Sequence, residues 1–275
     1  MTKDAGHNKL ANNKSDNSKS PDLNPDSFNS EKKISDKSQL GRIKHPRAVK
    51  SYVVRSGRMT YGQEKAFTEL WPVYGIEGGI DGGLEGNAQV LDFEQLFGRQ
   101  APVILEVGFG MGDSLIEIAS HHPENNYIGI EVHRPGVGRL LGNIGERALT
   151  NLRVMQFDAV EVLKTQILDN SLSAVYLFFP DPWHKRRHHK RRIVQDVFIQ
   201  LLRKKLLPHG QFHMATDWEP YAQQMLKTMI QAPGFKNCAA DGKYIPRPDY
   251  RPTTKFERRG ERLGHGVWDI MFEKT

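Results

Sequence analysis

Cysteine is nearly absent from this chain of 275 residues, which carries a single thiol at Cys238. One cysteine excludes an internal disulfide and a zinc site built from cysteines, and it is typical of a reducing compartment such as the cytoplasm. Long apolar runs are also missing, since none approaches the roughly 18 residues that a membrane-spanning helix needs. The polar N-terminal stretch lacks the apolar core of a secretory signal. We therefore expect a cytoplasmic protein that does not span a membrane.

A large excess of one charge is missing as well. The chain has 39 Lys and Arg against 32 Asp and Glu, a formal net charge of +7. Residues 1–46 hold nine of the basic and six of the acidic side chains, which leaves 30 against 26, a net of +4, in the remainder. With so small an excess, any binding to nucleic acid depends on a local basic cluster.

Composition divides the chain into three parts. Residues 1–46 are mostly polar, and their few apolar side chains cannot offset the entropy lost on ordering, so we expect a disordered tail. Residues 47–100 are predicted to form a basic arm and lead-in, with a loop at 75–86, where six glycines lie. Residues 101–275 are the expected folded domain.

Short apolar segments alternate with helical patterns from residue 101 onward. Continuous apolar strands separated by helices indicate an α/β fold, with a parallel sheet covered by helices on both faces. The expected helices include 114–119, 193–207 and 221–230. The expected strands are 103–107, 127–132, 152–157, 172–179, 210–215 and 267–272.

A glycine loop follows the first of these strands, with Gly108, Gly110 and Gly112 in alternate positions. Glycines here let the backbone approach a ligand closely, although a tight turn alone would also explain them. A dinucleotide fingerprint would need glycine at Asp113, and the Gly-Lys-Ser/Thr of a phosphate-binding loop is absent. The loop therefore disfavours a ligand that is held by its phosphates.

Three carboxylates accompany the loop. Glu106 lies inside the first strand, Glu131 at the end of the second and Asp158 at the end of the third. In an open α/β sheet these strand ends meet at one ligand site, and a carboxylate there can accept hydrogen bonds from ribose hydroxyls. Carboxylates without a phosphate cradle suit S-adenosylmethionine, which has an ammonium, a ribose and an adenine. A solvated strand end is the alternative for each acid, and Asp158 has the position of a helix N-cap.

The segment after the fourth strand combines a rigid turn with a basic run. Two prolines isolate Asp181, and six Lys or Arg with three His follow in 184–192. Beside a ligand cleft such a run favours contacts to the phosphates of RNA or DNA, whereas a solvated face or a localisation signal is the alternative. The histidines have no carboxylate partner, so we expect no metal site.

Together these segments resemble the bacterial tRNA (guanine-N7-)-methyltransferases. The matching motifs are 105–112, 127–132, 179–185, 215–217 and 254–257, and 51–58 resembles the basic arm of that family. The likeness covers about residues 47–273, and the Pro-Asp-Pro-Trp-His-Lys and Thr-Lys-Phe-Glu motifs are its more specific parts. It implies a Rossmann-like class I methyltransferase fold of about seven strands, the last antiparallel. It also implies methyl transfer from S-adenosyl-L-methionine to N7 of the guanosine at position 46 of the tRNA variable loop.

The resemblance also implies roles for individual residues, with tRNA as the partner, no obligate protein partner and a monomer or homodimer. Asp181 matches the catalytic position. The cofactor-binding positions are Glu106, Gly108, Gly110, Gly112, Glu131, Asp158 and Asp181. The substrate-binding positions are Lys185, Asp217, Thr254, Lys255, Phe256 and Glu257. The RNA-binding positions are Arg187, His188, His189, Lys190, Arg191 and Arg192.

Guanine N7 carries a free lone pair, so its methylation needs alignment more than a general base. Asp181 is expected either to stabilise the positive charge that develops on the ring or to accept hydrogen bonds from the guanine edge. Trp183 or Phe256 is expected to stack on the extruded base or, alternatively, to pack in the core.

Other functions fit the residues less well. Asp113 argues against a nicotinamide-dependent oxidoreductase, and the position of Cys238 argues against a cytosine-C5 methyltransferase. A non-catalytic RNA-binding protein, or a methyltransferase acting on another nucleic-acid position, remains the alternative.

Overall fold

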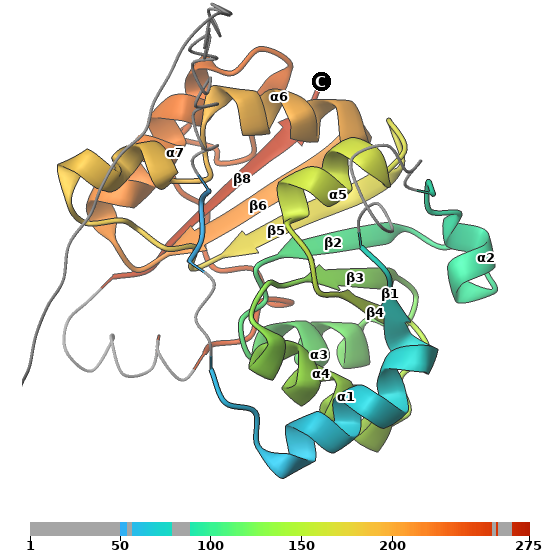
Figure 1. Cartoon of the computed structure of the whole chain (residues 1–275). Coiled ribbons are helices and arrows are strands. Elements are labelled where there is room, and N and C mark those ends of the chain that lie inside the picture. The colour runs from blue at the N-terminus through green and yellow to red at the C-terminus, as the bar shows by residue number, and fades with distance from the viewer. Residues whose placement is uncertain (1–49, 54–56, 79–88, 255–256, 258–265) are drawn as a thin grey trace, which may run out of the picture. The chain divides into compact units, whose positions relative to one another are not determined.

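The computed structural model describes residues 50–53, 57–78, 89–254, 257 and 266–275. Eight strands form one sheet in the order β1-β4-β3-β2-β5-β6-β8-β7 (Figure 1). The expected tail at 1–46, and Lys255 and Phe256 of the predicted site, lie outside the described residues.

The strands and helices have the following bounds. The strands are β1 Gly75–Ile76, β2 Val103–Val107, β3 Asn126–Ile130, β4 Leu152–Met155, β5 Leu172–Phe178, β6 Leu206–Thr216, β7 Phe235–Asn237 and β8 Trp268–Lys274. The helices are α1 Tyr61–Tyr74, α2 Phe93–Phe97, α3 Asp113–His121, α4 Arg134–Arg147, α5 Ala159–Thr165, α6 Asp196–Lys205 and α7 Glu219–Gln231, with a 3-10 helix η1 at Arg186–Arg191.

The sheet confirms the predicted class and corrects the strand count. All neighbouring strands pair in parallel except β8, which is antiparallel to both β6 and β7. The count is eight rather than about seven, because β1 and β7 are too short to show a periodic pattern. The prediction of a loop throughout 75–86 was wrong at its start, since Gly75 and Ile76 pair with β4.

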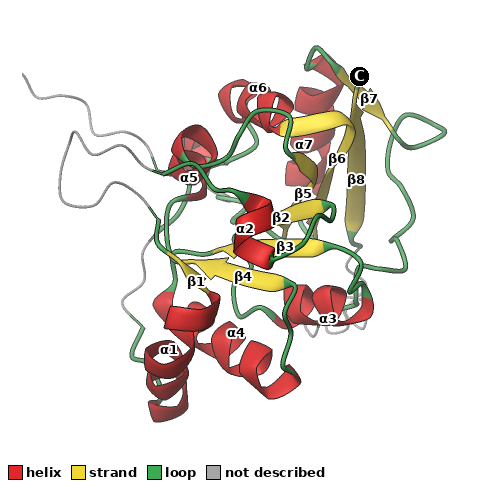
Figure 2. Ribbon diagram, turned by 90° about the vertical axis from the view of Figure 1, so that its right-hand side faces the viewer, coloured by secondary structure: helices red, strands yellow, loops and turns green. Residues whose placement is uncertain are grey.

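Helices cover both faces of the sheet, as the alternating pattern predicts. Helices α1, α3 and α4 pack on one face, and α5, α6 and α7 pack on the other (Figures 1 and 2). Each face has its own apolar cluster, with Leu115 and Leu140 in one and Val162 and Ile199 in the other. Among the described residues, no helix has both the length and the apolar character needed to cross a bilayer.

Helix α1 lies within the stretch that was predicted as an arm and lead-in. Thr60 and Gln63 form a reciprocal capping box at its start. Its face packs on α4 at Gly138 and Gly142, where small residues allow a close approach. A Cβ at Gly138 would lie 2.7 Å from the Gln63 carbonyl oxygen. Its contacts with α4 are not visible in local sequence, but the Thr60 and Gln63 capping box is a local signal that could have predicted the helix.

The boundary between α6 and β6 also differs from the prediction. Strand β6 begins at Leu206, four residues before the expected start at 210, because Leu206 already pairs with Leu172 of β5. The register then shifts, and Gln211 pairs with Ala174. The carboxyl ends of β5 and β6 therefore lie side by side, which places the segments after both strands at one edge of the sheet.

Candidate active site

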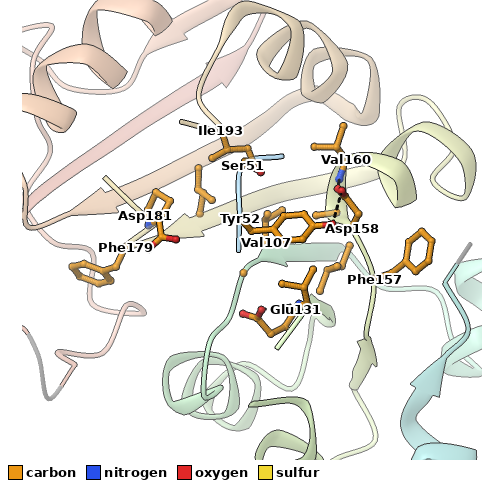
Figure 3. Close-up of a pocket in the computed structure, with 16 residues that line it drawn as sticks. Ser51, Tyr52, Val107, Glu131, Phe157, Asp158, Val160, Phe179, Asp181 and Ile193 are labelled. Atoms are coloured by element: carbon orange, nitrogen blue, oxygen red, sulfur yellow. Dashed lines mark hydrogen bonds between the residues drawn. The ribbon is translucent and has the colours of Figure 1, made fainter. Parts of the chain in front are cut away.

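A pocket opens at the carboxyl ends of β2, β3, β4 and β5, where the loops after these strands meet (Figure 3). Residues from four of the predicted positions line it, together with two residues of the arm that precedes α1. The polar lining residues are Ser51, Tyr52, Glu131, Asp158 and Asp181, and Gly108 lies at the end of β2.

The glycine loop has the backbone geometry that requires glycine. Gly108, Gly110 and Gly112 have φ values of 72°, 61° and 78°, in the left-handed region that strains other residues. Gly112 is also the N-cap residue of α3. Gly136 of α4 lets the loop sit close, because a Cβ at that position would lie 2.0 Å from the Gly110 carbonyl oxygen. The loop is therefore a tight cradle at the start of two helices.

Glu131 fixes the loop to the end of β3. Its Oε2 accepts a hydrogen bond from the Gly110 N–H at 2.8 Å. Its Oε1 accepts from the Val132 and His133 N–H groups at 2.7 and 2.9 Å. A carboxylate has about four acceptor positions, so one remains for a ligand hydroxyl beside these three bonds.

Asp158 serves as the N-cap of α5, which was the alternative interpretation of this residue. Its Oδ1 accepts from the Val160 N–H at 3.0 Å. Its Oδ2 accepts from the Tyr52 hydroxyl at 2.9 Å (Figure 3). The residue still lines the pocket, so capping and ligand binding are compatible at this position.

Glu106 is the most unusual of the predicted carboxyl groups, and it is not among the residues that line the pocket. It is only 3% exposed, and its Oε2 is buried without a hydrogen-bond partner in the described part of the chain. Burial, with a smaller contribution from the charge of Glu131, raises the pKa of Glu106 to about 8. A buried acceptor without a partner is costly, so this oxygen suits a ligand that brings a donor or a positive charge.

Asp181 stands in a rigid turn beyond β5. Phe179 has a φ of 51°, and Pro180 and Pro182 flank the acid on both sides. The Asp181 side chain is exposed and lines the pocket near Glu131 (Figure 3). A carboxylate that is held by the backbone and open to solvent is available to a substrate that enters the pocket mouth.

The acids fit the ammonium and ribose of S-adenosylmethionine. The orphaned Glu106 oxygen suits an ammonium group, and the remaining acceptor capacity of Glu131 suits a ribose hydroxyl. At Gly108 and Gly110, nothing lies within 4 Å of the place of a Cβ, so a ligand can approach the protein backbone closely. The match rests on these donor and acceptor properties, since the site offers carboxylates where a phosphate ligand would need positive charge.

The arm at residues 50–53 contributes to the pocket, and sequence reasoning gave none of these residues a site role. Trp183 Nε1 donates to the Ser51 carbonyl at 3.2 Å. Arg191 donates from Nε to the Lys50 carbonyl at 3.1 Å and from Nη2 to the Tyr52 carbonyl at 3.0 Å. The Arg191 guanidinium also lies 4.0 Å from the Trp183 ring centroid. Trp183 therefore holds the arm from a half-buried position outside the two apolar clusters, and its stacking on a base stays a prediction.

The basic segment divides into inward and outward side chains. Arg192 is 4% exposed, lies over the Tyr221 ring and donates to the Pro182 carbonyl at 2.8 Å. Together with Arg191 it therefore stabilises the turn and the arm, and its burial removes it from the set that we propose for RNA contact. The exposed cations are Lys185, Arg186, Arg187 and Lys190, while His188 and His189 are half-buried.

The predicted substrate-binding residues converge only in part. Lys185 and Asp217 are exposed beyond β5 and β6, and the contact of His184 with Trp218, with ring centroids 4.4 Å apart, joins their two segments. Thr254 is half-buried, and Glu257 is buried in an ion pair with Arg251. In the described ranges, no group of three or more His, Cys, Asp or Glu side chains could hold a metal ion.

Comparisons with known proteins add independent findings. The family described as "Putative methyltransferase" matches residues 100–270. A tRNA (guanine-N(7)-)-methyltransferase of Hydrogenovibrio crunogenus is 58% identical over 230 residues, which is 84% of this chain and 92% of that protein. The protein of the same name from Aeromonas hydrophila is 58% identical over 84% of this chain and 94% of its own length.

Among solved structures, the 16S rRNA methyltransferase KamB superposes with a TM-score of 0.52. The superposition covers 68% of this chain and 95% of that chain, at 16% identity. This likeness supports the methyltransferase fold alone.

Proposed function

This chain belongs to the tRNA (guanine-N7-)-methyltransferase family, and from that premise we propose that it methylates N7 of a guanosine in tRNA. The family that the motifs predicted is thereby confirmed. The target nucleotide that we propose is position 46 of the variable loop, as the resemblance implies. A tRNA substrate and the single cysteine favour a cytoplasmic location for the protein.

One observation of the structure carries the proposal. Carboxyl groups that follow β3, β4 and β5, namely Glu131, Asp158 and Asp181, line one pocket beside the glycine loop that follows β2, and the buried carboxyl group of Glu106 lies in β2 itself. A non-catalytic RNA-binding protein would have no use for Glu106, whose burial without a partner is destabilising until a ligand arrives.

We assign each part of the cofactor to a different residue of the site. Glu106 would bind the ammonium, Glu131 the ribose and Asp158 the adenine side, with Gly108 and Gly110 as the floor. When bound, S-adenosylmethionine supplies an electrophilic methyl group on sulfur. The chain's own part is to orient the acceptor base opposite that methyl and to exclude water.

Asp181 is the residue that we propose to contact the guanine that accepts the methyl group. The N7 lone pair of guanine forms the new bond, so no proton has to be removed from that nitrogen. Positive charge develops on the imidazole ring of guanine, and a carboxylate beside it is stabilising. The prolines at 180 and 182 restrict the backbone on both sides of Asp181, so the position from which its carboxylate projects is defined.

The role of Asp181 is tested by substitution to asparagine. We expect D181N to lose about 100-fold in kcat at saturating tRNA and cofactor, because the amide keeps the shape and removes the charge. Asp241→Asn, at an exposed turn beyond β7, is the matched control and should keep normal turnover. Near-normal turnover of D181N would refute the assignment.

The reaction itself is tested with labelled S-adenosylmethionine and unmodified tRNA transcripts, followed by nucleoside analysis. We expect 7-methylguanosine, and we expect it to vanish when the guanosine at position 46 is replaced. Label in another nucleoside would overturn the proposed target atom. No transfer, together with no binding of the cofactor, would favour the RNA-binding alternative.

A further inference from the structure

A buried arginine lies behind the predicted substrate segment and has no role in the proposed chemistry. Arg251 is 1% exposed and is the largest fully buried side chain of the described residues. Its Nε and Nη2 donate to the two carboxylate oxygens of Asp269 at 2.6 and 2.8 Å. Its Nη1 lies 2.7 Å from Oε1 of Glu257. One guanidinium therefore joins two buried carboxylates from different segments.

The Asp269 side is fixed by a second buried residue. His213 of β6 contacts Asp269 Oδ1 through Nε2 at 2.8 Å, and its Nδ1 lies 2.7 Å from the Tyr250 hydroxyl. Burial lowers the pKa of His213, so the ring is neutral. A neutral ring that donates from Nε2 accepts the Tyr250 proton at Nδ1, and this assignment satisfies the donors of His213 and Tyr250. Strand β8 thus offers Arg251 a rigid anchor.

The Glu257 side carries the substrate segment. Oε2 of Glu257 accepts from the Thr254 N–H at 2.7 Å, and the Glu257 N–H donates to Thr254 Oγ1 at 3.1 Å. This reciprocal pair is a capping box, in which each residue fixes the other. Because Glu257 is also paired with Arg251, the guanidinium holds the two described residues of the Thr-Lys-Phe-Glu motif, Thr254 and Glu257.

The same guanidinium reaches the segment before Asp181. Its central carbon lies 5.9 Å from the Phe178 ring centroid and 5.6 Å from that of Phe179. Phe179 lines the cofactor pocket and precedes the Pro180 turn. Arg251 is thus in contact with the end of β5 on one side and with Glu257 on the other.

We propose that Arg251 is a positioning residue for methyl transfer, which aligns Thr254 and Glu257 with the end of β5 through its ion pair with Glu257. This inference rests on the proposed function. It adds to the proposed function a residue that does not touch the substrate, because Arg251 is buried. Its charged partners, Glu257 and Asp269, do not line the cofactor pocket, although Phe179, which the guanidinium contacts, does. We therefore expect the loss of Arg251 to act mainly on the acceptor side, and the affinity for the cofactor is measured beside activity to test this.

The test is a double-mutant cycle with R251K and E257Q. Lysine keeps the positive charge, yet it cannot bridge two carboxylates with a rigid fork. We expect R251K to lose about 10- to 100-fold in kcat/KM for tRNA, while its Kd for S-adenosylmethionine stays within about twofold of wild type. If Arg251 acts through Glu257, the two substitutions are not additive. The kcat/KM of the double variant should then lie within about threefold of that of the less active single variant.

Lys205→Met is the matched control. Lys205 is also a buried cation, with its Nζ 2.7 Å from both the Ile167 carbonyl and Asp169. It directly precedes β6, at the amino end of that strand, whereas the pocket lies at the carboxyl ends of the parallel strands. Its loss should change stability and leave kcat/KM for tRNA unchanged below the melting range. A purely structural Arg251 would behave in the same way.

The outcomes separate the inference from the proposed function. Normal kcat/KM in a folded R251K, multiplicative effects of the two substitutions, or a parallel loss of cofactor affinity would each overturn the inference while wild-type transfer stands. Absence of transfer by the wild-type protein would overturn the proposed function. If R251K does not fold, Arg251→Met with Glu257→Gln leaves Asp269 paired with His213. That variant should bind the cofactor and transfer poorly, and normal transfer would refute the role.

Discussion

Glu106 is kept out of water by the strand that carries it, and this changes its acid–base behaviour. With a pKa of about 8, its carboxyl group is mostly protonated at pH 7. An ordinary glutamate is ionised there, because its pKa lies near 4.3. The group therefore stores a proton that a cationic ligand can displace, since a nearby positive charge stabilises the carboxylate and lowers its pKa.

We predict that binding of S-adenosylmethionine at pH 7 releases close to one proton from Glu106. Calorimetric titrations in buffers of different ionisation enthalpy measure that release directly. E106Q should abolish the release and weaken binding, whereas Glu69→Gln, on the exposed surface of α1, should change neither. A binding enthalpy that does not depend on the buffer would contradict the assignment of the ammonium to Glu106.

Other residues of the site have two tasks each. Asp158 caps α5 while it lines the pocket, and Glu131 holds the glycine loop while it keeps acceptor capacity for a ligand. Loss of a capping residue costs about 1 kcal/mol of stability, so a substitution of Asp158 changes folding as well as binding. Activity data on such variants need a stability measurement beside them.

At the scale of elements, the 3-10 helix η1 sorts its cations by direction. Arg191 and Arg192 turn inward to backbone carbonyls of the arm and of the Pro182 turn. The exposed cations of the segment are left to meet solvent or RNA. The tight turn of a 3-10 helix places residues three apart on one side, so a run of like charges need not face one way.

We predict that replacing Lys185, Arg186, Arg187 and Lys190 by glutamine flattens the salt dependence of tRNA binding. The slope of log affinity against log salt should decrease by about 0.7 to 0.9 for each phosphate that the variant no longer neutralises. Filter binding or fluorescence anisotropy over a salt series measures it. An unchanged slope would mean that the segment is a solvated face.

The control for that series removes charge elsewhere. Lys227 of α7 and Lys236 of β7 are exposed and lie away from the pocket, so glutamine at both should leave the slope unchanged. R192Q belongs to a different class, because this side chain is buried. We expect it to lower stability rather than to change the salt dependence.

At the scale of the whole molecule, the buried network of Arg251, Asp269 and His213 connects β6, β8 and the segment that contains Arg251. Burial lowers the pKa of His213, and hydrogen bonds from His213 and Arg251 lower that of Asp269 although burial opposes them. In both cases the unfolded chain binds protons that the folded chain does not. Stability is therefore lost as the pH falls, for His213 below about 6.5 and for Asp269 only below about 4.

We predict that the free energy of unfolding decreases by up to about 1.4 kcal/mol through His213 as the pH is lowered from 7.5 to 5.5. Urea denaturation at the two pH values measures it. H213Q should be less stable at pH 7.5 and less sensitive to pH, whereas His121→Gln, at an exposed position, should keep the wild-type dependence. Glu106 acts with the opposite sign, since its raised pKa favours the fold at low pH, so both variants are compared in the E106Q background.

The sequence by itself determined the order of the central strands and helices, the glycine loop and the family. These features depend on residues that are close in sequence, so apolar periodicity and short motifs report them. The positions of Glu131 and Asp158 at the pocket were also predicted this way, because a carboxylate at the end of a parallel strand has a predictable place. Glu106 lies inside β2, and the ligand roles of all three residues stay predictions. The capping role of Asp158 was foreseen for the same local reason.

Only the tertiary structure decided which distant residues meet. Tyr52 bonds to Asp158 across 106 positions, and His213 bonds to Asp269 across 56. The insertion of β8 between β6 and β7 creates the second of these pairs and with it the anchor of Arg251. A buried charge is tolerated only where partners converge on it, and that convergence is set by the packing of whole elements rather than by any local pattern.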